Sequence, residues 1–178
     1  MNESEKRVRF RVGQQNIKTA IATTLVALVY LLVGRNPTFA CIGAIFGTGT
    51  SMDNSKLNGG NRFFGTIIGG VLGMLLFRLY MVFYPDGKAR PLMLLFVFVG
   101  VVLLVLISRI FWVGAVQPGG VVLCILLYNT PVDRYISYSV NRIIDTGIGV
   151  LIALVVSWLL PRERMYKILR ALRLKKKQ

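Results

Sequence analysis

The sequence predicts an all-α membrane protein whose six transmembrane helices form a 3+3 inverted repeat. Three observations predict this fold: apolar residues form six long runs, basic residues gather outside them, and one motif occurs twice. Of the 178 residues, 54% are hydrophobic and 16% are charged. Soluble domains carry about a quarter charged residues, so this composition favours a membrane domain. We expect that domain over residues 12–160, followed by a basic amphipathic tail over 161–178.

Each uncharged run is long enough to form one helix across a bilayer. A helix needs about 20 residues to span the hydrocarbon core, or fewer where flanking lysines and arginines extend to the headgroups. Backbone groups in lipid must also find hydrogen bonds within the chain, which a helix supplies. The six runs cover residues 19–34, 36–52, 63–77, 91–108, 110–132 and 146–160.

The net charge of +15 lies mainly outside these runs. Five basic residues occupy positions 6–18 and eight occupy positions 162–177. This placement follows the positive-inside rule, so we expect both ends on the cytoplasmic side of the cell membrane, or the cytoplasmic membrane in a bacterium. It argues against nucleic acid as a partner and in favour of the lipid bilayer. The tail is expected to lie on the anionic inner leaflet.

A motif at residues 61–73 returns 80 positions later, at residues 141–153. Five of thirteen positions are identical: asparagine, arginine, threonine, isoleucine and glycine. The match defines one repeat over 12–80 and a second over 91–160, each with a third helix that Asn-Arg is expected to open. Three helices per repeat is an odd number, so the second repeat must enter from the opposite side.

The second and fifth helices, over 38–52 and 119–130, are interrupted or preceded by glycine and proline. In inverted-repeat transporters, such segments line the substrate path. Small residues there can also serve tight helix packing, and both interpretations stay open. The third and sixth helices carry small residues at a spacing of four, including Gly65, Gly69 and Gly149, which predicts close packing.

Arg62 and Arg142 are the residues of the repeated motif whose placement in a membrane costs the most free energy. At a helix start, where the backbone dipole is already positive, an arginine calls for an anion nearby. The alternative is that both side chains extend to the lipid headgroups. The candidate substrate-binding residues are Lys18, Arg62, Arg142, Asn61, Asn141, Thr66 and Thr146.

Two acids complete the candidate set. Asp145 lies one helical turn after Arg142 and could form an ion pair with it, whereas Arg62 has Gly65 at the equivalent place. The counter-charge of Arg62 would then come from Asp53, from elsewhere, or from a bound anion. Either acid could instead carry a proton in an antiport cycle.

The chain contains no histidine and only seven acidic residues. This excludes histidine-containing zinc sites and histidine-based triads and argues against an enzyme, so we expect no metal and no cofactor. Cys41 and Cys124 lie inside apolar runs and are expected to be buried free thiols.

The segments NIKTAIATT, NPTFA and RFFGTIIGG resemble the aromatic acid exporter and fusaric acid resistance superfamily, to which the plant aluminium-activated malate transporters are related. The resemblance implies a six-helix unit that pairs with another, as a homodimer or as two halves of a longer chain. It also implies small organic anions as substrates, with Lys18, Arg62 and Arg142 at the matching positive positions.

We therefore expect membrane transport of small organic or aromatic carboxylates, by an exporter or an anion channel acting as a homodimer. The anion, the direction, and a path within or between subunits stay open. The alternative is a non-transporting membrane scaffold or anchor for a partner protein.

Overall fold

The computed structural model describes residues 14–161 and residue 164. Over this part of the chain the backbone forms six α-helices and two 3-10 turns, with no strand, which confirms the all-helical prediction. The predicted tail lies almost wholly outside the described residues. The elements are α1 (Gln14–Val33), α2 (Thr38–Gly47), α3 (Met52–Phe83), α4 (Pro91–Phe111), η1 (Val113–Ala115), α5 (Val116–Asn129), η2 (Val132–Arg134) and α6 (Tyr135–Leu159).

Four of these helices, α1, α3, α4 and α6, are long and apolar enough to cross a membrane. The other two have 10 and 14 residues, and so rise only about 15 and 21 Å against a hydrocarbon core of about 30 Å. α2 ends early because Thr48 and Ser51 have extended backbone. α5 ends at Asn129, before Thr130 and Pro131, and the residue before a proline favours extended backbone. The prediction of six helices therefore holds, but two of them are short.

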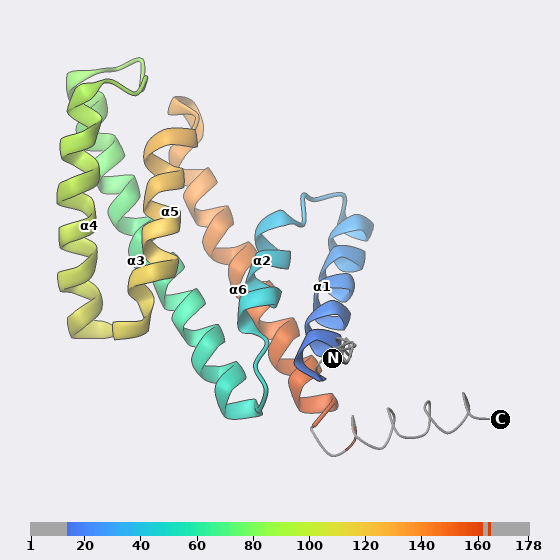
Figure 1. Ribbon diagram of the computed structural model, residues 1–178. Coiled ribbons are helices and arrows are strands. Elements are labelled where there is room, and N and C mark those ends of the chain that lie inside the picture. The colour runs from blue at the N-terminus through green and yellow to red at the C-terminus, as the bar shows by residue number, and fades with distance from the viewer. Residues whose placement is uncertain (1–13, 162–163, 165–178) are drawn as a thin grey trace, which may run out of the picture.

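Figure 1 shows the arrangement: α3 and α6 cross the molecule side by side in opposite directions, with α4 outermost at one edge and α1 at the other. α5 packs against α3, and α2 packs against α6. The described ends, Gln14 of α1 and Leu159 of α6, lie toward the same end of the molecule, the lower one in Figure 1.

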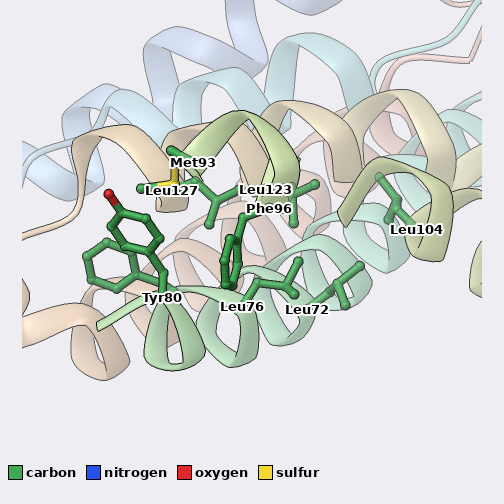
Figure 2. Close-up of a cluster of buried hydrophobic side chains, with 9 residues drawn as sticks. Leu72, Leu76, Tyr80, Met93, Phe96, Leu104, Leu123 and Leu127 are labelled. Carbon is green, nitrogen blue, oxygen red and sulfur yellow. The ribbon is translucent and has the colours of Figure 1, made fainter. Parts of the chain in front are cut away.

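Two hydrophobic clusters form the core. One joins α3, α4 and α5 through large side chains, among them Leu76, Tyr80 and Phe96 (Figure 2). The other joins α1, α2 and α6 and is built largely of small residues, such as Ala22, Ala44 and Ala153. The small side chains bring the backbones of this second group close together.

The small residues of α3 and α6 serve close helix packing, as predicted. A Cβ atom added to Gly69 would collide with the backbone of Gly119 in α5. A Cβ atom added to Gly149 would collide with the carbonyl of Ala40 in α2. These glycines let each short helix lie directly against a long one.

The predicted starts of the third and sixth helices are wrong. α3 begins at Met52, where the Ser51 side chain accepts a hydrogen bond from the Asn54 backbone N–H at 3.2 Å and caps the helix. α6 begins at Tyr135, shortly after Pro131. Arg62 and Arg142 consequently lie inside their helices, where the backbone N–H groups are already bonded. The N-termini of α3 and α6 therefore do not help these arginines to bind an anion, contrary to the prediction.

Candidate functional site

A cavity of about 430 Å³ lies between the end of α2, the first third of α3 and the start of α5. Its size falls in the usual range for small-molecule sites, about 300–1,000 Å³. These helix segments lie toward the lower end of the molecule in Figure 1. The lining residues are Phe46, Asn58, Asn61, Arg62, Gly114, Gln117, Pro118 and Val121.

Arg62 is the charged residue in this lining, and it is 5% exposed. No ion pair involves it within the described residues, and its Nε atom is buried without a hydrogen-bond partner there. Its guanidinium carbon lies 5.4 Å from the ring centre of Phe46, within cation–π range. A buried charge is costly without a partner. The cavity beside Arg62 offers room for a negative group.

Amide side chains provide the other polar groups of the cavity, and one of them is firmly held. The Trp112 indole Nε1–H donates to the Asn61 side-chain oxygen at 2.6 Å. The backbone of Gly114 lies close against the same amide. This contact fixes the link between α4 and α5 on α3 and holds the start of α5 beside Arg62. Asn58 and Gln117 also line the cavity.

The equivalent arginine, Arg142, has different surroundings. Its guanidinium carbon lies 3.2 Å from the ring centre of Phe39 and 4.2 Å from that of Tyr138. Its Nε atom is buried without a hydrogen-bond partner in the described part of the chain. Two aromatic faces thus hold this cation, and it does not line the cavity at Arg62.

Asp145 forms its ion pair with Arg35 rather than with Arg142. The Arg35 guanidinium lies 3.0 Å from the Asp145 carboxylate, and the Tyr30 hydroxyl donates to the same carboxylate oxygen at 2.8 Å. Arg35 also donates to the Asn141 side-chain oxygen at 3.3 Å. Neither Tyr30 nor Arg35 was predicted from the sequence to contact Asp145. The sequence feature that could have indicated Arg35 is its position in the Gly-Arg-Asn-Pro link between two predicted helices.

The remaining predicted residues lie apart from the cavity. The Thr66 hydroxyl donates to the Arg62 carbonyl at 2.8 Å within α3. Thr146 is fully buried, and its backbone lies against Gly43 of α2. Lys18 is buried on α1, and Asp53 is exposed in the first turn of α3, about 13 Å along the helix axis from Arg62. Of the predicted set, the structure brings only Asn61 and Arg62 to the cavity.

No cluster of three or more potential metal ligands occurs in the described part of the chain. Cys41 and Cys124 are free and partly buried. The groups that the cavity presents to a ligand are therefore one buried guanidinium, several side-chain amides and an aromatic ring. Such a set can bind an anion reversibly.

Long apolar helices, two short helices laid against them and a buried cation beside a cavity define a multi-pass helical membrane protein. A family model described as aromatic acid exporter family member 1 matches residues 10–160. The chain belongs to that family, whose name describes membrane transport rather than catalysis. Searches of curated proteins and of solved structures found no match for the chain.

Proposed function

We propose that this protein transports small organic or aromatic carboxylate anions across the cell membrane, through a path that passes Arg62. The observation that carries the proposal is the buried guanidinium of Arg62 at a cavity with no acid in its lining. A carboxylate that enters the cavity would supply the missing counter-charge. The family membership supports transport of aromatic acids in particular.

The lining suits an anion with an apolar body. Phe46, Pro118 and Val121 offer apolar surface, and Asn58, Asn61 and Gln117 offer hydrogen bonds. An aromatic ring can lie against the first group while its carboxylate meets Arg62. We assign Asn141, Arg142, Thr146, Thr66 and Lys18 to other parts of the same path, or to its walls.

An inverted repeat is part of this proposal, and packing between α3 and α6 supports it. A Cβ atom on Gly59 would lie 2.7 Å from Val150, and one on Gly70 would lie 3.2 Å from the Ser139 hydroxyl. Positions 59 and 139 differ by 80, and so do positions 70 and 150. The same pair of repeat positions thus meets twice with the helices exchanged, as a two-fold axis requires.

The orientation and the assembly also belong to the proposal. We infer from the basic residues at both ends that Gln14 and Leu159 face the cytoplasm, and we propose that the protein acts as a homodimer. Many lipid-side residues of α4, such as Leu94, Leu95 and Phe98, are exposed in the single chain and are available to lipid or to a second copy.

The test is anion efflux from liposomes that contain the purified protein. We expect Arg62→Ala to reduce efflux of an aromatic carboxylate such as benzoate by about tenfold or more, because an ionic hydrogen bond contributes about 1.5–3 kcal/mol. Arg78→Ala is the matched control, because Arg78 lies on the same helix but is exposed. Arg142→Ala tests whether the second arginine belongs to the path.

Four outcomes of these efflux measurements are informative. Efflux that Arg62→Ala leaves unchanged would overturn the site. Absence of efflux from the unaltered protein would favour the scaffold alternative. A pH gradient that drives uptake against the anion gradient would identify a proton-coupled exporter, whereas flux that follows the anion gradient alone would exclude proton coupling.

A further inference from the structure

The link between α1 and α2 is tied to α6 by one acid. Asp145 of α6 accepts from Arg35 in the link and from Tyr30 at the end of α1. The Asp145 side chain is 7% exposed, whereas that of Arg35 is 43% exposed. We call Tyr30, Arg35 and Asp145 the α1–α2 latch. It joins residues 110 or more positions apart in the chain.

The latch lies beside the start of a short helix, α2, whose other end reaches the cavity. Gly34, with φ of 70°, ends α1: its N–H donates to the Leu31 carbonyl at 3.2 Å, and the Arg35 N–H donates to the Tyr30 carbonyl at 3.0 Å. α2 follows directly after Pro37, and Phe46 near its other end lines the cavity and lies beside Arg62. Release of Arg35 would therefore free the link and, with it, the end of α2 that lies away from the cavity.

A second cation, Arg142, lies near Asp145. Arg142 lies one turn before Asp145 on α6, a spacing that places the two side chains on the same side of the helix. It is held by two aromatic faces, and its Nε atom is buried without a hydrogen bond in the described residues. If Asp145 turned from Arg35 to Arg142, the acid would stay paired, and the buried Nε atom of Arg142 would gain a hydrogen-bond acceptor. Both arrangements avoid an unpaired buried carboxylate, whose cost is high.

We propose that the α1–α2 latch is a gate, which opens when Asp145 exchanges Arg35 for Arg142. The gate lies at the end of α1 opposite Gln14, the upper end in Figure 1, whereas the cavity lies toward the lower end. In the closed arrangement the ion pair ties the link that precedes α2 to α6. The exchange lets α2 move away from α6 and connects the cavity to the upper side. The purpose of this gate rests on the proposed transport function, but the test of the gate does not depend on transport.

The test is the reaction of a cysteine in the cavity with a membrane-impermeant maleimide added on the upper side. Gln117→Cys supplies the target, in a protein whose Cys41 and Cys124 are replaced by alanine. We expect Arg35→Gln to raise the labelling rate about tenfold, which corresponds to a population shift of about 1.4 kcal/mol. Arg35→Lys should restore most of the slow rate. Arg134→Gln, an exposed arginine at the same end, should change nothing.

Two further variants test the exchange of partners. Arg142→Gln should slow labelling below that of the unaltered chain, because the open arrangement loses its ion pair. Asp145→Asn removes the ion pair of both arrangements, so Arg142→Gln should have no further effect on labelling once Asp145 is asparagine. Independent, additive effects of the two substitutions would overturn the exchange. Fluorescence-detected size exclusion confirms that each variant is folded before it is labelled.

The gate and the transport function can fail separately. Labelling requires no substrate, and efflux is measured in parallel with Arg62→Ala. If Arg35→Gln leaves labelling unchanged while efflux still depends on Arg62, the gate is overturned and the transport function stands. If labelling responds as expected but the unaltered chain shows no efflux, the transport function is overturned while the partner exchange stands.

Discussion

Arg62 and Arg142 occupy equivalent places in the repeated motif, but their neighbours differ. Arg142 lies between two aromatic rings, with an acid one turn away. Arg62 has one ring at 5.4 Å and a cavity. A cation–π contact contributes about 2 kcal/mol or more when desolvated, which is small beside the cost of burying an unpaired charge. This imbalance is why Arg62, rather than its twin, is the better candidate for direct contact with an anion.

Gly149 gives a prediction at the scale of one residue. A Cβ atom there would collide with the Ala40 carbonyl, so Gly149→Ala must push α2 away from α6. We expect it to destabilise the protein by about 1–3 kcal/mol, measured by SDS-induced unfolding in mixed micelles. Gly120→Ala is the matched control, because its added Cβ would have only Leu104 within reach, at 3.8 Å. That control should be neutral or slightly stabilising, since alanine favours helix more than glycine does. Equal stability of the two variants would contradict the packing role of Gly149.

At the scale of elements, the sequence predicted the order of the six helices but misplaced two helix starts. The uncharged runs begin just after Arg62 and Asp145, which suggested that polar residues mark helix ends. In fact residues 52–62 are helical, and several of their polar side chains face a cavity inside the protein. Ser51 followed by Met-Asp-Asn was the capping signal that could have placed the start of α3. The partner of Asp145 was beyond prediction, because it depends on a tertiary contact between the α1–α2 link and α6.

A second prediction concerns the extended stretch that joins α2 to α3. The Ser55 hydroxyl accepts from the Gly49 N–H, donates to the Ser51 carbonyl, and lies 2.9 Å from the Ser157 hydroxyl of α6. Ser55→Ala leaves these buried groups without that partner, so we expect a loss of about 1–3 kcal/mol in the free energy of unfolding. The same SDS titration measures it.

Ser137→Ala is the control for that experiment. Ser137 lies exposed near the start of α6, and its hydroxyl bonds only to the nearby Arg134 carbonyl, at 3.1 Å. We expect a change within about 0.5 kcal/mol. A loss at Ser55 no larger than at Ser137 would show that the junction between α2 and α3 is held by other contacts.

At the scale of the whole molecule, the two halves of the chain have the same order of helices, but their equivalent regions differ. The half-site at α3 and α5 encloses a cavity, whereas the equivalent region at α6 and α2 is filled by aromatic rings and closed by an ion pair. The repeat was readable from the sequence, but this asymmetry was not, because it arises at positions outside the shared motif. In the inverted repeat that we propose, such a difference between the two halves fits alternating access.

Orientation in the membrane is the last prediction, and it concerns the whole chain. α3 runs from the end where Met52 lies to the end where the 84–90 link lies (Figure 1). The positive-inside rule places the Met52 end in the cytoplasm. In a protein without native cysteines, Ala89→Cys should therefore react with an impermeant maleimide in intact cells, whereas Asp53→Cys should react only after permeabilisation. Both positions are exposed, so access to the reagent depends on the side of the membrane alone. Labelling of Asp53→Cys in intact cells would reverse the orientation, and with it the direction in which the Arg62 cavity opens.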